Sequence, residues 1–314
     1  MFGVPVMHGR RRIALLVLTA VLAGTGIGTA WLLRDPLPYF QQRRASLSGV
    51  VESDVTLEGG YELQPVRLVA SSGLVVDLMV RRAVADSARR LPLVVLLGGH
   101  ATGRSAARLL GDTRGLLVAA LSYPFAGTHR PDPVTFVREI PKIRTAFLDT
   151  PPALMLALDY LTRRPDVDTA RVEAAGVSLG VPFICIASAL DRRFTRAWAI
   201  HGSGGSYVPL EMNMRRTIPF APLRLPAAVI ANVIIAGPRL DPARWVGRIA
   251  PRPFVMLNAE GDQQLPRHVI EALYRSAGYP KQLLWLRGRH VRPDTAVVRE
   301  LAAMVVARIR ADSP

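Results

Sequence analysis

The sequence predicts one α/β domain whose central sheet is mostly parallel and covered by helices on both faces. Of the 314 residues, 50% are hydrophobic, which is enough for a large core. From residue 91 onward, continuous apolar runs of strand length alternate with segments of helical spacing, the pattern of a parallel sheet buried on both sides. A separate apolar stretch at the amino terminus predicts a single transmembrane helix ahead of this domain.

Residues 1–34 form the predicted membrane anchor. Residues 13–33 carry no charge, and a helix of 21 residues covers roughly the 30 Å of a bilayer core. Arg10, Arg11 and Arg12 precede this stretch, so the positive-inside rule keeps the amino terminus cytoplasmic and sends the domain across the membrane, to the periplasm or cell surface. The alternative is a signal peptide cleaved after Ala30, which would make the domain a secreted protein.

After the anchor, the composition predicts a linker at 35–48 and a domain at 49–314. Segments rich in β-formers open the domain as antiparallel strands. The strands expected in order are 49–57, 61–70, 74–82, 91–99, 115–124, 170–177, 195–202, 251–262 and 281–290. The expected helices are 105–113, 150–163, beginning at Thr150 with prolines in its first turn, 179–190, 266–278 and 297–310.

One motif lies at a predicted junction between strand and helix. Gly176-Val177-Ser178-Leu179-Gly180 places a serine between two glycines, which is the pattern of a sharp turn that exposes a nucleophilic hydroxyl above a sheet. The pattern alone is weak evidence for a nucleophile. Its position between a predicted buried strand and a predicted helix is the one that such a turn requires. Ser178 is therefore the candidate nucleophile.

A serine nucleophile needs a histidine base and a carboxylate to orient that base. Asp262 and His290 follow two later predicted strands, in the order serine, aspartate, histidine. Glu260 is the rival acid. His201 also ends a strand, but we interpret the glycine-rich segment after it as a turn beside the site.

Two backbone N–H groups are expected to stabilise the oxyanion of acyl transfer. One is that of Leu179, at the positive end of its helix. The other is that of His100, with Ala101 as the alternative, because Gly98-Gly99 lets this loop approach a ligand closely.

The chain resembles a serine hydrolase of the α/β-hydrolase superfamily, nearest to the branch of dienelactone hydrolases, acetyl xylan esterases and prolyl oligopeptidase-like enzymes. The resemblance rests on RPDVDTARVEAAGVSLG, VGRIAPRPFVMLNAEGDQQLP and LRGRH. It implies hydrolysis of a small-molecule carboxylic ester through an acyl-enzyme on Ser178. Val181 and Asn258-Ala259 depart from residues common in relatives, which weakens any transfer of substrate preference. Residues 204–245 are interpreted as a cap-like insertion over the site, with an ordinary sheet-covering helix as the alternative.

Two other functions remain open at this stage: a peptidase or amidase of the prolyl oligopeptidase-like type, and a membrane-tethered binding protein of the same fold without catalysis. The formal charge of +16 comes almost entirely from scattered arginines, so we expect no nucleic-acid partner. Cys185 is the single cysteine, no pair of histidines has the spacing of metal ligands, and no phosphate-binding glycine motif follows a strand. We therefore expect neither a metal nor a cofactor, and the sequence does not predict an oligomeric state.

Overall fold

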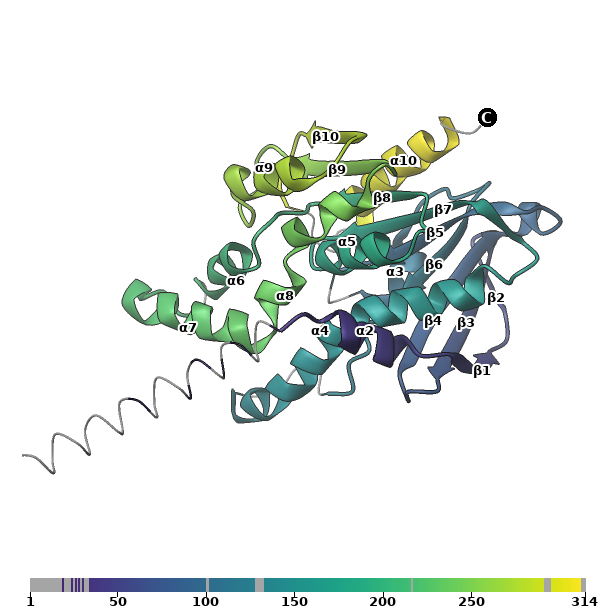
Figure 1. Ribbon diagram of the computed structural model, residues 1–314. Coiled ribbons are helices and arrows are strands. Elements are labelled where there is room, and N and C mark those ends of the chain that lie inside the picture. Colours follow the sequence, from purple (N-terminus) through teal and green to yellow (C-terminus); the bar gives the residue numbers. More distant parts are fainter. Residues whose placement is uncertain are drawn as a thin grey trace, which may run out of the picture.

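The computed structural model of the chain describes residues 34–99, 102–127, 133–215, 217–290 and 295–311, together with Thr19, Gly24, Gly26, Gly28 and Ala30. Within these residues ten strands form one sheet, in the spatial order β1-β3-β4-β6-β5-β7-β8-β9-β10, with β2 beside β3 (Figure 1). Along this order, every neighbouring pair from β6 to β10 is parallel. The pairs β1–β3, β3–β4 and β4–β6 are antiparallel. The mostly parallel sheet predicted from the sequence is confirmed.

The strand positions follow the apolar runs closely. β5 and β6 are buried at every residue, as expected for central strands covered on both faces. The strands are β1 (Leu47–Glu52), β2 (Thr56–Glu58), β3 (Tyr61–Ala70), β4 (Val75–Ala83), β5 (Leu91–Leu97), β6 (Leu117–Leu121), β7 (Val167–Val177), β8 (Arg196–Ile200), β9 (Phe254–Ala259) and β10 (Lys281–Leu286).

The two faces of the sheet are covered unequally. One face packs against α2 (Leu37–Arg44), α4 (Pro133–Leu161), α5 (Gly180–Leu190) and α9 (Arg267–Ser276). The other packs against α3 (Ala106–Leu109) and α10 (Thr295–Ala311), of which α3 has only four residues. Between β8 and β9 lie α6 (Tyr207–Met214), α7 (Ala221–Ile234) and α8 (Gly237–Leu240), and α7 projects from the body of the domain (Figure 1).

The helix expected at 150–163 begins earlier, at Pro133, and continues through Pro141, Pro151 and Pro152. Proline removes a backbone donor, and helices often start at one, which is why the sequence predicts a start at Thr150. In the structure Thr150 lies inside the helix, where its hydroxyl donates to the carbonyl of Ala146 at 2.7 Å. Burial of the apolar residues on either side of the prolines outweighs the local preference.

The segment predicted as a linker contains α2, which packs against the domain. Phe40 is fully buried, with its ring 6.1 Å from that of Trp245. Arg43 forms a two-pronged ion pair with Asp149 of α4, at 2.8 and 2.6 Å. The ordered domain therefore begins before Leu37.

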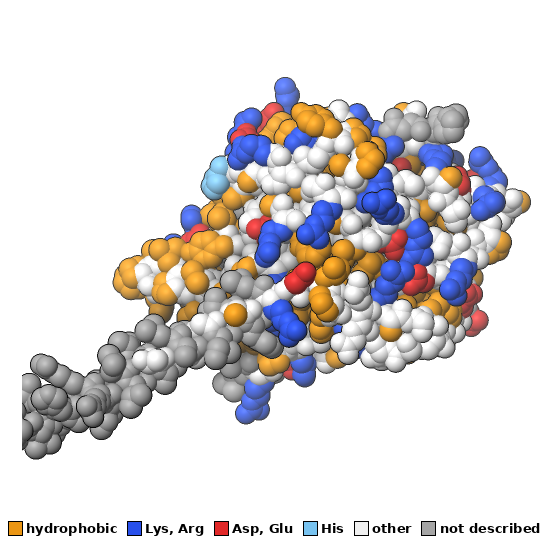
Figure 2. All heavy atoms as spheres, viewed as in Figure 1, with side chains coloured by type: hydrophobic (Ala, Val, Ile, Leu, Met, Phe, Trp, Pro, Cys, Tyr) orange, Lys and Arg blue, Asp and Glu red, His pale blue; other side chains and the backbone are white. Residues whose placement is uncertain are grey.

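No helix among the described residues is both long and apolar enough to cross a membrane. The stretch predicted to do so, 13–33, lies outside the described residues except for five positions. A separate apolar surface lies on the projecting α7, where Figure 2 shows hydrophobic side chains gathered. Its exposed apolar residues include Leu223 and Ile230 of α7 and Phe220 just before it, which is 66% exposed.

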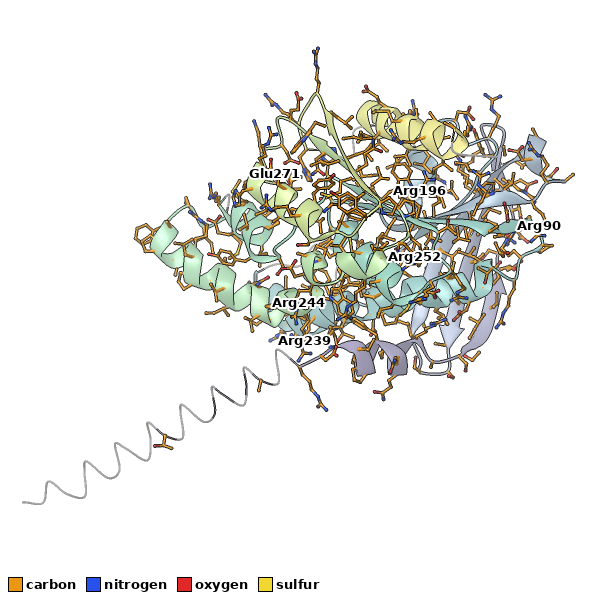
Figure 3. All side chains as sticks on the ribbon, turned by 45° about the horizontal axis from the view of Figure 1, so that its top comes forward. Arg90, Arg196, Arg239, Arg244, Arg252 and Glu271 are labelled. Carbon is orange, nitrogen blue, oxygen red and sulfur yellow. The ribbon has the colours of Figure 1, made fainter. Side chains whose placement is uncertain are left out.

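The positive charge is distributed over many elements. Figure 3 labels Arg90 before β5, Arg196 in β8, Arg239 in α8 and Arg252 before β9. Arg196 and Arg252 lie at the starts of the paired strands β8 and β9, whereas Arg90 and Arg239 belong to other parts of the domain. Arg252 serves the fold, because its guanidinium donates to the carbonyls of Asp191, Phe194 and Ser188. These labelled arginines do not form a single basic face.

Candidate active site

Ser178 occupies a strained turn between β7 and α5. Its φ of 52° lies in the left-handed region, which a non-glycine residue adopts at a cost of about 1–3 kcal/mol. The turn is held by the Ser178 N–H, which donates to the carbonyl of Ile200 at 2.8 Å. Such strain persists only where the surrounding structure imposes it.

Both glycines that flank Ser178 are required by close packing. A Cβ on Gly176 would lie 2.8 Å from the carbonyl oxygen of Gly180, and a Cβ on Gly180 would lie 2.2 Å from that of Leu97. Neither obstacle can move, because both are backbone atoms. The glycines let α5 start directly against the sheet, which lifts Ser178 above its carboxyl edge.

The structure brings Ser178, His290 and Asp262 together in one hydrogen-bonded chain. Ser178 Oγ lies 3.0 Å from His290 Nε2, and His290 Nδ1 lies 2.7 Å from Asp262 Oδ2. Asp262 follows β9 and His290 follows β10, so neighbouring parallel strands deliver both to the same edge of the sheet. The serine hydroxyl thus has an imidazole beside it whose far nitrogen faces a carboxylate.

Asp262 is held as a carboxylate. Burial raises the pKa of Asp262, but hydrogen bonds from His201, His290 and the Gln264 N–H outweigh it and lower that pKa well below its usual range. Oδ1 accepts the backbone N–H groups of Gln264 and Leu265 at 2.8 and 2.9 Å, which leaves Oδ2 for the histidines. Its orientation is therefore fixed by the loop after β9.

His201 also lies in this cluster, although the sequence analysis assigned it only to a neighbouring turn. It is 2% exposed, its Nδ1 lies 3.4 Å from Asp262 Oδ2, and its ring lies 5.0 Å from that of His290 in a T-shaped arrangement. Its φ is 51°, and Asn258 supports the turn by donating to the carbonyl of Gly202 at 2.9 Å. The signal for it was its place at the end of β8, at the same edge as Ser178.

His201, Asp262 and His290 are also residue types that bind metals, and their ligand atoms lie within 4.8 Å of one another. This grouping was not predicted from the sequence. The 2.7 Å between His290 Nδ1 and Asp262 Oδ2 is a hydrogen-bond distance, whereas a tetrahedral zinc that bound both atoms at about 2.1 Å would hold them roughly 3.4 Å apart. This geometry fits proton transfer to and from Ser178 better than metal coordination.

The rival acid does not join the cluster. Glu260 is exposed, and among the described residues no contact links its carboxylate to either histidine. Its backbone N–H donates to the carbonyl of Leu286, so the residue serves as part of the turn. Of the two acids considered, the structure places Asp262 beside His290.

Of the two expected oxyanion donors, one lies within the described residues and the other lies outside them. Leu179 immediately precedes α5, and its N–H has no acceptor among the described residues, so it is available to a substrate oxygen. His100 and Ala101 lie outside the described residues. Gly98 and Gly99, just before them, line the same cavity as Ser178.

This cavity, which we call the nucleophile cavity, has a volume of about 550 Å³, within the range of ligand pockets. Ser178, Leu179 and His290 form part of its wall, and most of the remainder is apolar. From the segment 204–245 interpreted as a cap, Asn213 is the residue that lines it among those described. Among the described residues, α7 contributes none to this wall.

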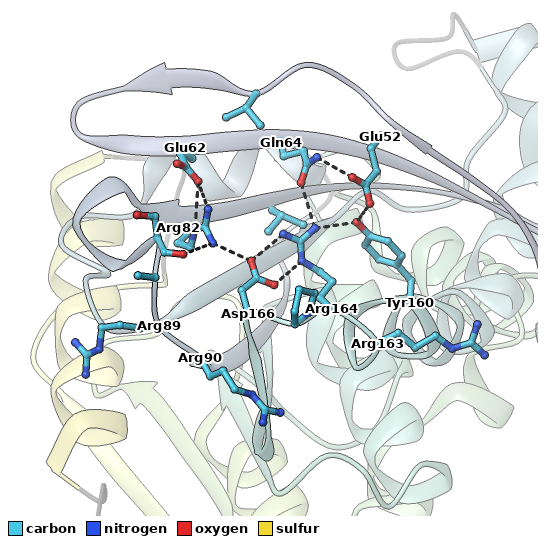
Figure 4. A pocket seen from close by; sticks show the side chains of 15 residues that line it. Glu52, Glu62, Gln64, Arg82, Arg89, Arg90, Tyr160, Arg163, Arg164 and Asp166 are labelled. Atoms are coloured by element: carbon cyan, nitrogen blue, oxygen red, sulfur yellow. Dashed lines mark hydrogen bonds and ion pairs between the residues drawn. The ribbon is translucent and has the colours of Figure 1, made fainter.

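A second cavity, the arginine cavity, has a volume of about 720 Å³ and lies near the loop before β5. In Figure 4 the carboxylates of the wall lie close to Arg82 and Arg164, whereas Arg89, Arg90 and Arg163 point away from this cluster. Arg82 pairs with Glu62 at 2.6 Å and with Asp166 at 3.2 Å, and Arg164 pairs with Asp166 at 2.9 Å. Burial together with a hydrogen bond to Glu52 raises the pKa of Tyr160 to about 12.

Several solved structures share this architecture. Acetyl xylan esterase 1 from Thermoanaerobacterium sp. JW/SL YS485 aligns with a TM-score of 0.60 at 14% identity, covering 88% of this chain and 94% of the esterase. An acetyl xylan esterase from Paenibacillus sp. R4 gives a TM-score of 0.60 at 17% identity, covering 86% and 90%. A glucuronoyl esterase from Solibacter usitatus gives a TM-score of 0.53 at 15% identity, covering 90% of this chain and 93% of the esterase.

No protein-family model matches the chain, and no curated protein matches it significantly. The structural likeness is therefore a likeness of fold at low sequence identity. The order and direction of the strands, the turn at Ser178 and these alignments together give one conclusion: the chain has the α/β-hydrolase fold.

Proposed function

We propose that this chain is a serine hydrolase that cleaves carboxylic esters through an acyl-enzyme on Ser178. The observation that carries the proposal is the hydrogen-bonded chain from Ser178 through His290 to Asp262, which begins at a strained turn and borders a cavity. The structural neighbours that are named as esterases support the same reaction class. None of the steps below requires a cofactor.

In the proposed reaction, Ser178 Oγ attacks the ester carbonyl carbon while His290 Nε2 takes the hydroxyl proton. The anionic Asp262 stabilises the resulting imidazolium through Nδ1. His290 then gives its proton to the departing alcohol oxygen, which leaves Ser178 acylated. Water enters, His290 removes its proton as the new C–O bond forms, and the carboxylic acid is released when Oγ recovers a proton from His290.

The substrate oxygen becomes negative in both halves of the reaction. The Leu179 N–H at the start of α5 is the first proposed donor, aided by the positive end of the helix. The second is the N–H of His100, with Ala101 as the alternative. Removing one such donor in other hydrolases typically costs about 100- to 1000-fold in turnover, so this pair is a substantial part of the proposed catalysis.

The direct test is covalent labelling of the full chain with a fluorophosphonate, together with hydrolysis of p-nitrophenyl butyrate. We expect labelling and hydrolysis in the natural chain and in Ser48→Ala, an exposed serine in β1, and neither in Ser178→Ala. Labelling with hydrolysis of a p-nitroanilide but of no ester would favour the peptidase or amidase alternative. No labelling of a folded chain would favour the non-catalytic binding protein.

We also propose that residues 13–33 anchor the chain in a membrane with the catalytic domain outside the cytoplasm. The length and apolar composition of this stretch and the exposed apolar residues of α7 support the idea. The full chain should then stay with membranes during alkaline carbonate extraction. A mature protein that begins near Trp31 would instead show a cleaved signal peptide.

A further inference from the structure

The nucleophile cavity extends from Ser178 along the sheet, beneath α10. Its sheet-side wall includes Leu96 and Val94 of β5 and Val177 and Ala175 of β7. Residues two apart on a strand share one face, so these pairs form a wall that runs back along the strands. The cavity therefore continues inward from the hydroxyl group, along the less covered face of the sheet.

The opposite wall is one face of α10. Its lining residues recur at helical spacing: Val298, Leu301, Ala302, Val305, Val306 and Ile309. From the first of these to the last, the helix rises about 16 Å at 1.5 Å per residue. The cavity thus has an apolar wall along most of α10.

The sheet gives the same length independently. The lining reaches Val118 of β6, which pairs with Val94 of β5, and Val94 pairs with Glu173 of β7. Glu173 precedes Ser178 by five residues, or roughly 16 Å at 3.3 Å per residue. Both walls therefore describe a space that extends roughly 16 Å along the sheet from the nucleophile.

The composition of the wall selects the kind of group that fits. No Asp, Glu, Lys or Arg occurs among the described residues that line the cavity. Besides Ser178 and His290, the polar side chains of the wall are Thr102, Thr113, Asn213 and Gln264. A sugar or a peptide backbone placed there would lose many hydrogen bonds to water and gain few, whereas an alkyl chain would lose none. The deep part of the cavity is suited to a hydrocarbon.

The space exists because this face of the sheet has little helical cover. α3 is four residues long, and Ala106 contributes a small side chain to the wall. On the other face, the 29 residues of α4 and the 11 of α5 pack against the sheet. Protein interiors are otherwise close-packed, so a space of this size next to a reactive hydroxyl is well suited to a ligand.

We propose that the nucleophile cavity binds the alkyl chain of a medium- or long-chain fatty acyl ester, with the ester carbonyl at Ser178. This inference rests on the proposed ester hydrolysis and names its substrate class. It predicts a preference different from that of the two neighbours named for acetyl esters.

The first experiment measures kcat/KM for p-nitrophenyl acetate, butyrate, octanoate and laurate with the full chain. Each methylene that enters an apolar site strengthens binding by up to about fourfold, so kcat/KM should rise by about tenfold or more from acetate to octanoate. If acetate is the best substrate, the acyl-chain proposal is wrong while ester hydrolysis stands. If no ester is hydrolysed and no fluorophosphonate reacts, the proposed function itself fails.

A matched pair of variants on α10 tests where the alkyl chain of the substrate binds. Ala302→Phe fills the cavity, and Ala303→Phe adds the same ring on the exposed side of the helix. Ala302→Phe should lower the ratio of kcat/KM for laurate to kcat/KM for acetate by about tenfold or more, because the ring takes the space of several methylenes. Ala303→Phe should keep the natural profile. Equal profiles for the two variants would overturn the placement.

A measurement on the natural chain guards against a variant that does not fold. The second-order rate of labelling by a long-chain alkyl fluorophosphonate is compared with that of the ethyl compound. Faster labelling by the long-chain compound supports the proposal, and equal or slower labelling contradicts it.

Discussion

The two cavities of this domain differ in what their polar groups face. In the arginine cavity, Arg82, Arg164, Glu62 and Asp166 bond to one another, so its charges are largely satisfied within the protein. In the nucleophile cavity, the Ser178 hydroxyl and the Leu179 N–H border an apolar space. The larger cavity is thus built like a structural ion-pair network, and the smaller one like a site for chemistry.

The largest expected effect that separates the two cavities is on catalysis. Ser178→Ala and His290→Ala should each reduce p-nitrophenyl ester hydrolysis by about a thousandfold or more, and the double variant should lose little further. Their losses overlap because nucleophile and base act as one unit. Steady-state kinetics with circular dichroism as a folding control measures this, and additive losses would contradict the shared role.

The next effect concerns the acid. Asp262→Asn should lower turnover by up to about ten-thousandfold, because the amide no longer holds His290 in the correct tautomer or stabilises its charged form. Glu260→Gln, two residues away and exposed, is the control and should be mild. If the two results were reversed, the acid would be Glu260 and the hydrolase proposal would stand.

A smaller effect is expected at His201, whose contact with Asp262 is long. His201→Asn removes the imidazole but tolerates the left-handed backbone. Asp262 keeps its bonds to His290 and two backbone N–H groups, so turnover should fall by about tenfold, the value of one hydrogen bond to a charged group. A kcat unchanged from the natural chain would assign His201 to structure alone.

The arginine cavity should affect stability and leave catalysis almost unchanged. Arg164→Met removes one of the two arginine partners of Asp166 and should lower the free energy of unfolding by about 2–4 kcal/mol, with kcat/KM within about twofold of the natural value. Urea unfolding and ester kinetics on the same sample test both parts. Loss of activity in a folded Arg164→Met protein would mean that the two cavities are coupled.

Acid pH should weaken the same network. Burial raises the pKa of Asp166, but its hydrogen bond and ion pair with Arg164 outweigh this and lower it. A carboxylate with a lowered pKa in the folded state stabilises the protein above its unfolded pKa of about 3.9, and this contribution is lost as the pH falls below that value. The free energy of unfolding should therefore decline from about pH 4 downward, and Asp166→Asn should reduce the slope.

The features that could be predicted from the sequence are those that depend on residues close together in the chain or on the order of the strands. The glycines beside Ser178 are adjacent in the chain, and their need for close packing is visible in the motif, so the turn was predictable. Asp262 and His290 were predictable because each follows a predicted strand of the parallel part of the sheet. The order of the elements carried this information.

Features that depend on packing between distant segments were not predictable. The nucleophile cavity results from the short α3 and from the position of α10 over the sheet. No single residue or motif in the sequence predicts how far α10 lies from the sheet. His201 meets Asp262 only through the pairing of β8 with β9. The early start of α4 required knowing that its apolar face would be buried on the sheet.

The docking of α2 changes the reach of the domain. An extended linker over residues 35–48 would span up to about 46 Å. Phe40 and the Arg43–Asp149 pair fix α2 to the domain, so only residues 34–36 remain as a linker. The linker spans about 10 Å at most. If residues 13–33 lie in a bilayer, the domain is held against the lipid surface and cannot swing far from it. Its substrates would then be molecules met at that surface.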